Sequence, residues 1–280
     1  MELILFLIGF VALWQGSYVV LVDWLGLYKA YAFPSPVGVV ERFFSLMESG
    51  TLTEAIGNSL LRGVEGYFIA VLIGAVLGMA LYHFSFFKKT LRPFILGVQT
   101  LPSVCWVPFS ILWFGLSEQA ILFVVVMGSA FSIAISVDNA MQHVPPIHEK
   151  VALTLGANKR QLYGKVIFHA CLPELVSGLK QGWSFAWRAL MAGEVMTTSI
   201  GLGQTLVTGR DLADINQVAL VMVLIIVIGI LIDQCIFSAL ERHLLAKRGL
   251  LPATQTKKKE GKGQRILVYP MKKVKQMLFD

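Results

Sequence analysis

Charge is scarce in this sequence, because Asp, Glu, Lys and Arg make up only 15% of its 280 residues. Soluble domains carry about 25% charged residues, so the composition argues against a water-soluble fold. Cysteine is also rare, and Cys105, Cys171 and Cys235 each lie in or beside an apolar segment, which is typical of packing rather than of a disulfide scaffold. With no Gly-X-Y period and little charge outside the C-terminal tail, collagen-like and disordered classes are excluded too.

The sequence also lacks the side-chain groupings that metal and nucleotide sites need. Its five histidines are dispersed, without a pair at i and i+4, so no metal site is predicted. A phosphate loop of the form G-x-x-x-x-G-K-S/T occurs nowhere, and no set of nucleophiles and carboxylates stands at catalytic spacing. We therefore expect no cofactor and no ATP site on this chain, and an energy source must lie elsewhere.

What the sequence has instead is long apolar runs, since 56% of its residues are hydrophobic. A bilayer core of about 30 Å needs about 20 helical residues. Six stretches meet that length and predict an all-α integral membrane protein with six transmembrane helices, at residues 2–22, 66–84, 94–116, 119–137, 168–195 and 218–240. The first stretch lacks the basic start and small-residue cleavage site of a signal peptide, so we count it as a span.

The positions of Lys and Arg predict the orientation of the chain, because positive residues stay on the cytoplasmic side. If both termini are cytoplasmic, eighteen of the 24 basic residues lie inside. The net charge of +7 is then mostly a topology signal, and nucleic-acid binding is not needed to explain it. The lysine-rich segment 250–280 is predicted to be a basic cytoplasmic tail, either solvated or in contact with anionic membrane lipid.

The cytoplasmic segment 143–167 is far longer than a tight connection. It contains Pro145 and Pro146, which favour a helix start, and periodic apolar residues on both sides of Gly156. A glycine permits a sharp turn and a close approach of the backbone to a neighbour. The segment is therefore predicted to form two short helices that meet at Gly156 and offer a docking surface to another protein.

Motifs in and around this segment resemble those of a known family. Residues 149–157 read EKVALTLGA, and Val166-Ile167 and Leu172-Pro173 follow. This pattern resembles the EAA loop of ABC-importer permeases. Further motifs are similar to the nitrate, sulfonate and bicarbonate subgroup, which includes taurine and alkanesulfonate importers: Phe33-Pro34-Ser35-Pro36, Leu101-Pro102-Ser103, Pro108 and LWFGL at 112–116.

The resemblance implies a type I ABC importer permease fold, with six transmembrane helices and a cytoplasmic coupling-helix loop. It also implies a non-catalytic subunit of the bacterial inner membrane that works as a pair on two ATPase subunits, which hold ATP and Mg. An extracytoplasmic binding protein would deliver the solute, a small anion. The chain would then divide into a first span at 1–32, a permease core at 33–249 with the coupling loop at 143–167, and the tail at 250–280.

In the family that this chain resembles, the loop docks on the ATPase. The corresponding residues here are Glu149, Lys150, Ala152, Gly156, Ala157 and Leu162. Counted back from Gly156, the family's glutamate falls on Lys150, whereas Glu149 lies one residue earlier. Either Glu149 makes the ATPase contact in a shifted register, or the contact is made differently. His169 also stands where many relatives have a proline.

The fifth span is unusually polar, and its charged side chains are expected to face the bundle interior or water. At about 100° per residue, the fifth-span residues of the predicted pathway, given below, fall within one sector of about 120° of the helix. Small residues suited to close packing lie on the opposite side. The third span adds polar residues beside Pro102, where a kink frees backbone carbonyls. The predicted translocation pathway comprises Gln99, Thr100, Ser103, Ser177, Lys180, Ser184, Trp187, Arg188 and Glu194.

Alternatives stay open for these residues and for the function. The third-span cluster could serve only to satisfy the kink, and Lys180 or Arg188 could form an internal ion pair with Glu174, Glu194 or Asp233. A self-contained secondary transporter or channel is the main competing function, but no convincing internal repeat occurs. An intramembrane enzyme would need catalytic groupings that the sequence lacks. The sequence therefore favours an importer permease.

Overall fold

The computed structural model describes residues 2–29 and 31–247, which are helical apart from short connections and contain no strand. The predicted all-α class is confirmed, whereas the predicted tail at 250–280 lies outside the described residues. The helices are α1 (Glu2–Tyr18), α2 (Pro36–Glu48), α3 (Thr51–His83), α4 (Ser85–Val98), α5 (Val107–Phe114), α6 (Glu118–Gln142), α7 (Pro146–Thr154), α8 (Lys159–Gln161), α9 (Phe168–Met196), α10 (Leu202–Asp211), α11 (Ile215–Ile232) and α12 (Ser238–Lys247).

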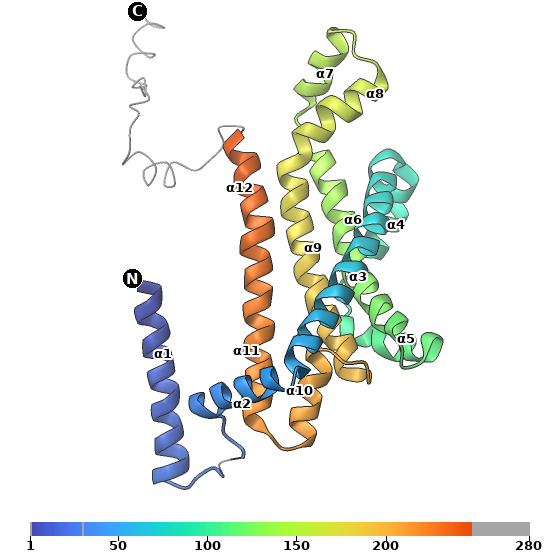
Figure 1. Ribbon diagram of the computed structural model, residues 1–280. Helices are drawn as coiled ribbons and strands as arrows, with labels where there is room; N and C mark the ends of the chain where they lie inside the picture. The colour runs from blue at the N-terminus through green and yellow to red at the C-terminus, as the bar shows by residue number, and fades with distance from the viewer. Residues whose placement is uncertain (1, 30, 248–280) are drawn as a thin grey trace, which may run out of the picture.

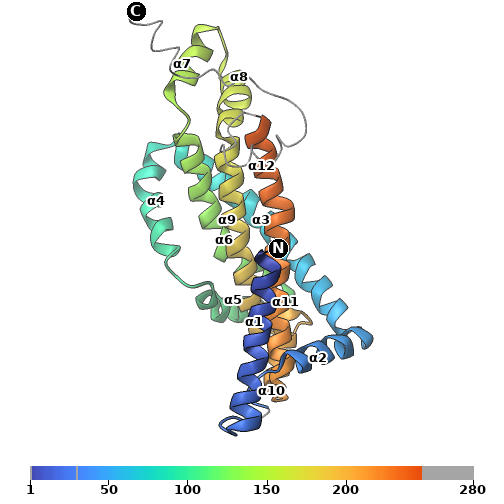
Figure 2. The same cartoon turned by 90° about the vertical axis from the view of Figure 1, so that its left-hand side faces the viewer.

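Three long helices form the centre of the molecule, because α3 and α9 both pack along α6. Figure 1 shows α7 and α8 projecting beyond one end of this bundle, which we call the coupling end, while α2 and α10 lie at the other end. In the rotated view of Figure 2, α12 reaches toward the coupling end and α1 runs along the outside of α11. The indole of Trp14 in α1 donates a hydrogen bond to the Pro34 carbonyl oxygen at 2.9 Å.

Small residues allow the central helices to approach one another closely. A Cβ atom at Gly78 of α3 would lie 2.6 Å from the Ala134 carbonyl oxygen, and one at Gly178 of α9 would lie 2.4 Å from the Ser136 Cβ. Both distances are shorter than van der Waals contact, so the packing of α3 and α9 on α6 depends on glycine. The small-residue side predicted for the fifth span, which includes Gly178 and Ala186, is buried.

Three helices among the described residues are long and apolar enough to cross a membrane. They are α3, α6 and the continuous helix Ile215–Ala246 that contains α11 and α12. The predicted fifth span is present as α9, which has 29 residues but is more polar, and the predicted first span is present as α1 and the turn that follows it. The predicted count of six spans is therefore not confirmed in full.

The predicted third span is wrong as a single helix. Residues 94–116 are divided between α4 and a second segment, Ser103–Phe114, and the two are bent by 98°. The chain leaves the helical path before Pro102, which takes a ψ of 138°. Proline has no N–H and disfavours a helical residue before it, so it breaks the run. Pro108 lies in the first turn of α5, where proline is tolerated.

The connection predicted between the first two spans contains more helix than expected. Ser35 caps α2, since its hydroxyl accepts a hydrogen bond from the Gly38 N–H at 2.9 Å. α3 begins at Thr51 rather than at residue 66, so Arg62, which the sequence placed in the outer connection, lies inside a long helix. Arg62 is therefore part of the helical bundle and not of a loop.

We predict that Gly78→Val destabilises the protein, whereas Gly57→Val on the same helix does not. The side chain added at position 78 would collide with α6, and overpacking costs about 1–3 kcal/mol. No atom lies within 4 Å of a Cβ atom built at Gly57, so this control tests the same change in open space. Thermal unfolding in detergent measures the difference, and equal melting temperatures for the two variants would contradict the packing.

Candidate functional site

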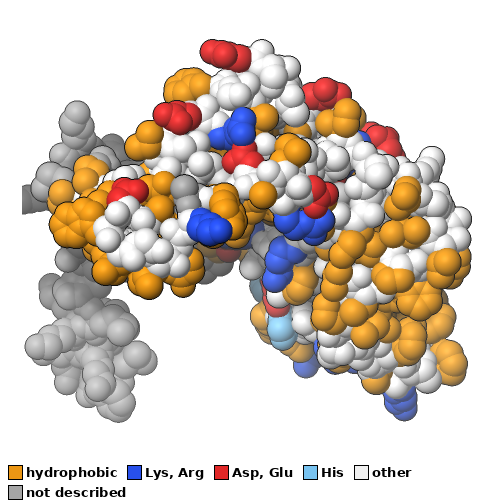
Figure 3. All heavy atoms as spheres, turned by 90° about the horizontal axis from the view of Figure 1, so that it is seen from below, with side chains coloured by type: hydrophobic (Ala, Val, Ile, Leu, Met, Phe, Trp, Pro, Cys, Tyr) orange, Lys and Arg blue, Asp and Glu red, His pale blue; other side chains and the backbone are white. Residues whose placement is uncertain are grey.

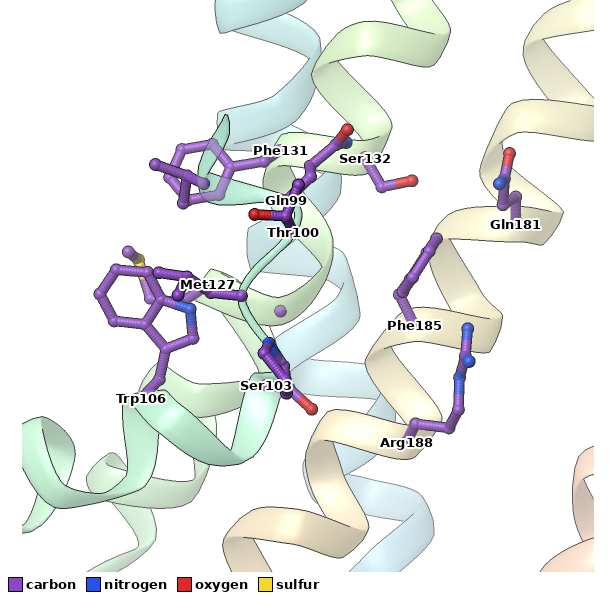
Figure 4. A pocket seen from close by; sticks show the side chains of 14 residues that line it. Gln99, Thr100, Ser103, Trp106, Met127, Phe131, Ser132, Gln181, Phe185 and Arg188 are labelled. Atoms are coloured by element: carbon purple, nitrogen blue, oxygen red, sulfur yellow. The ribbon is translucent and has the colours of Figure 1, made fainter. Parts of the chain in front are cut away.

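The bend between α4 and α5 borders a pocket of about 450 Å³ that α6 and α9 close from the other side. Figure 4 shows Ser103 and Ser132 facing the α9 side of this pocket, where Gln181, Phe185 and Arg188 lie. Four of the predicted pathway residues therefore meet here, together with two that were not predicted. The polar lining residues are Gln99, Thr100, Ser103, Ser132, Gln181 and Arg188, and the apolar ones include Trp106, Met127, Phe131 and Phe185.

Thr100 satisfies the bend itself, which is one of the alternatives left open by the sequence. Its hydroxyl donates to the Gly97 carbonyl oxygen at 2.7 Å, and its N–H reaches the same oxygen at 3.1 Å. In the part of the chain that the structure describes, the side chains of Gln99 and Ser103 make no hydrogen bond. These two side chains can therefore bind a solute in the pocket.

Arg188 provides the positive charge of the pocket. Its side chain is exposed, its Nε donates to the Ser184 carbonyl oxygen at 3.0 Å, and its guanidinium lies 4.7 Å from the centre of the Phe185 ring. It forms no ion pair with a carboxylate of residues 2–29 or 31–247, and no Asp or Glu lines the pocket. The remaining N–H groups of Arg188 can thus donate to an anion.

Lys180 lies on the same predicted face of α9 as Arg188, but its ammonium pairs with a carboxylate and does not line the pocket. Its ammonium is 3.3 Å from an Asp233 carboxylate oxygen and 3.0 Å from the Ser238 hydroxyl. This pair joins α9 to the α11–α12 helix, as the ion-pair alternative anticipated. Ser184 donates to the Lys180 carbonyl oxygen at 3.3 Å, and the exposed Ser177 does not line the pocket.

Trp187 lies in the hydrophobic core. Its indole N–H donates to the Ile225 carbonyl oxygen at 3.2 Å, and its ring stacks on Trp183. Leu190 and Val221 belong to the same buried cluster. The predicted sector of α9 therefore covers two surroundings, because Trp187 occupies its core-facing edge and Arg188 its pocket-facing edge.

Glu194 is fully buried in a cluster of polar groups rather than in the pocket. Its carboxylate accepts hydrogen bonds from the Ser59 hydroxyl at 2.8 Å and the Gly203 N–H at 2.9 Å, and lies 3.3 Å from an Arg62 guanidinium nitrogen. Arg62 is also 2.8 Å from a Glu118 carboxylate oxygen. The cluster thus ties together α3, α6, α9 and α10.

Sequence reasoning missed Ser59 and Arg62 because a charge ended the apolar run that defined the second span. A signal was nevertheless present, because a stripe of mostly small or polar residues at helical spacing leads into the predicted span. The buried positions of α3 are Leu52, Ala55, Ser59, Arg62, Gly63, Gly66, Ala70, Gly74, Gly78 and Leu81.

A second polar link lies nearer the coupling end. The Arg92 Nε donates to the buried Asp138 carboxylate at 2.9 Å, and its Nη2 donates to the Asn139 side-chain oxygen at 2.9 Å. This link fixes the middle of α4 to the end of α6. α6 is therefore fastened near both ends, to α3, α9 and α10 through the Glu194 cluster and to α4 through Arg92.

The predicted coupling loop is a pair of short helical segments with a small core. Ala152 and Leu162 are buried against Ile167, and Ala157 packs on them. Gly156 has a φ of +82°, and no atom lies within 4 Å of a Cβ atom built there. The exposed residues of the loop include the two candidates for the ATPase contact and an apolar side chain at the tip: Glu149, Lys150 and Leu155.

A bent span that borders a polar pocket, next to a helical loop that projects beyond the bundle, defines the membrane subunit of a transport system. Residues 70–245 match the family described as binding-protein-dependent transport system inner membrane component. The chain belongs to this family. It is therefore the non-catalytic permease subunit of an ABC importer and a multi-pass inner-membrane protein, and the ATPase is a separate subunit.

The names of similar proteins agree with this assignment. The chain is 30% identical over 241 residues to a Bacillus subtilis (strain 168) protein that carries the name aliphatic sulfonates transport permease protein SsuC, covering 85% of this chain and 84% of the relative. It is 25% identical to the nitrate import permease protein NrtB of Synechocystis sp., and the match covers 72% of this chain and 77% of NrtB. A solved inward-facing MetNI methionine ABC transporter matches 69% of this chain and 96% of its own with a TM-score of 0.57 and 20% identity, which shows a shared fold.

We predict that Arg62→Gln destabilises the protein by about 3–5 kcal/mol, because the buried Glu194 carboxylate loses its charged partner. The double variant Arg62→Gln/Glu194→Gln is expected to recover part of this loss, since no buried charge remains unpaired at Glu194. Arg210→Gln removes an exposed pair with Asp211 and should change stability by about 0–1 kcal/mol. Unfolding of the three variants in detergent provides the comparison, and a loss at Arg62 no larger than at Arg210 would refute the role of the cluster.

Proposed function

We propose that the pocket at the α4–α5 bend lines the path of a small anion, and that two copies of this chain form that path together. The observation that supports this most directly is Arg188, which is exposed to the pocket and has no carboxylate partner among the residues described. Its neighbours Gln99, Gln181 and Ser132 offer hydrogen-bonding groups of both kinds. A solute with negatively charged oxygens fits this combination.

The pairing of two copies is supported by the open side of the pocket. Figure 3 views the molecule from the α2 and α10 end and shows a hollow between apolar surfaces, with Lys and Arg side chains on its wall. One copy encloses such a hollow only in part. A second copy related by two-fold symmetry would supply the missing wall, as is usual for closed homo-oligomers.

The substrate class follows from the names of the relatives and the chemistry of the pocket. The relatives include permeases for aliphatic sulfonates, nitrate and taurine. Arginine binds planar or tetrahedral oxyanions through two parallel N–H donors. We infer that the solute is a sulfonate, taurine, nitrate or bicarbonate, delivered by an extracytoplasmic binding protein at the end that carries α2 and α10.

The coupling end is then cytoplasmic, as are both termini. Two ATPase subunits, which bind ATP and Mg, would contact the coupling loop through Glu149 or Lys150 and around Gly156. Ala152, Ala157 and Leu162 support this surface from inside the loop. When the ATPase subunits close, the loop moves with them, and the fastened helices α3, α6 and α9 reorient as a rigid body.

We predict that Arg188→Gln lowers anion transport at least tenfold without a change in melting temperature. A charge at about 4 Å from an anion is worth about 4 kcal/mol at an effective dielectric of about 20, and tenfold corresponds to about 1.4 kcal/mol of that. Lys180→Gln should instead lower the melting temperature, because it leaves Asp233 without its partner. Anion uptake is measured in vesicles that contain the whole importer, and the melting temperature of each variant is measured alongside it.

Native mass spectrometry of the same preparations checks assembly, with two copies of this chain and two ATPase chains expected. Normal transport by Arg188→Gln would rule out its role in the path. A fall in both transport and melting temperature for Arg188→Gln would assign this residue to structure instead.

We predict that Gly156→Val uncouples ATP hydrolysis from transport, whereas Gly156→Asn retains most of the coupling. A β-branched residue is strained at a φ of +82°, while asparagine tolerates this left-handed region. Since no neighbouring atom is close to the glycine, the two variants differ in backbone strain and not through a clash inside the chain. Transport per ATP hydrolysed decides the question, and equal coupling in both variants would contradict a role for the turn.

A further inference from the structure

A groove of about 1060 Å³ lies at the coupling end, outside the bend pocket. Its walls come from the last turns of α3 and α6 and the first turns of α9, and it extends to the coupling loop. The walls are mostly apolar and include Ala75, Met79, Val137 and Leu175. The groove is slightly larger than the range of about 300–1,000 Å³ that is typical of ligand pockets.

The part of the groove next to the coupling loop is charged. Lys159 and Arg160 at the start of α8 line it and are exposed. Neither forms an ion pair within the described residues, and Glu149 is the acidic residue that lines the same groove. The His83 ring of α3 lies 5.1 Å from the Tyr163 ring, so α3 and the loop meet at this rim. The rim thus carries two cations against one acid.

The end of α3 indicates the level of the groove in the bilayer, given the proposed orientation. Phe84, between α3 and α4, and Phe86 and Phe87, in the first turn of α4, are exposed, and Lys88 and Lys89 follow them. Exposed aromatic rings followed by lysines are typical of the cytoplasmic membrane interface. Figure 1 shows α7 and α8 beyond this turn. The apolar walls therefore lie at hydrocarbon depth, and the cationic rim lies at the level of the head groups or above it.

We propose that this groove binds an anionic phospholipid of the cytoplasmic leaflet, with its phosphate at Lys159 and Arg160 and an acyl chain along the apolar walls. Apolar walls that end in unpaired cations match the two parts of such a lipid. A lipid bound here contacts α3, α6 and α9 as well as the coupling loop, so it supports the position of the loop. The inference rests on the proposed orientation and not on the anion path.

Lipid retention by the intact importer tests the proposal. The complex of this chain with its ATPase is incubated with phosphatidylglycerol and phosphatidylcholine, and the lipids retained are counted by native mass spectrometry. Wild type should prefer phosphatidylglycerol, and Lys159→Gln/Arg160→Gln should reduce this preference by about fivefold per charge removed, which corresponds to about 1 kcal/mol each. Lys165→Gln is the matched control, because Lys165 is exposed on the same loop, does not line the groove and is not a candidate for the ATPase contact.

A second variant separates a lipid site from an ATPase contact. Ala75→Phe fills the apolar part of the groove without a change of charge, so it should lower retention of phosphatidylglycerol while the ATPase chains stay bound. Equal retention of both lipids by wild type, or full retention by Ala75→Phe, would overturn the proposal. Loss of ATPase chains from the Lys159→Gln/Arg160→Gln variant with unchanged lipid would assign the surface to the ATPase. Lipid counts are independent of transport, so failure of the anion path would leave this result intact.

Discussion

Backbone hydrogen bonding inside the membrane is the constraint on which the rest of this structure depends. In hydrocarbon every N–H and C=O must find a partner within the protein, so the spans are helices. The chain departs from this rule between α4 and α5, and it can do so because the break lies against α6 and faces a cavity lined by polar side chains. The pocket occurs at this break, where the Thr100 hydroxyl bonds the Gly97 carbonyl oxygen and other polar side chains line the cavity.

The charges in the bundle are divided between fastening the helices and lining the pocket. Opposite charges meet in the Glu194 cluster, between Arg92 and Asp138, and again at Lys180, so none of these groups leaves an isolated charge. Arg188 alone among the residues that line the pocket carries a formal charge. The pocket is therefore positive, because Arg188 lines it and no Asp or Glu does.

Hydrophobic length was sufficient to predict α6 and α11, because each lies in one run that no break interrupts. α9 also follows its predicted span, although charged residues interrupt that run. Hydrophobic length failed for the first part of α3, since Glu65 and Arg62 precede the apolar run in the sequence, even though Glu194 accepts the charge of Arg62 in the fold. It failed at the bend because residues 94–116 pass the length test, and the pattern does not say at which proline the helix stops. In the site, periodicity put Trp187 and Arg188 in one sector of α9, but it carries no information about which neighbour covers each edge of that sector, and Trp187 packs in the core while Arg188 lines the pocket.

The coupling loop contains its own small core, in which Ala152, Leu162 and Ile167 pack together, and the side chain of Asn158 caps the segment after the turn. A segment that is packed in this way is rigid, so it can transmit a push as well as a pull. An unstructured linker can transmit only a pull. A partner that approaches and withdraws can therefore drive the spans in both directions through one contact. The forward and the return step of the transport cycle need no second connection.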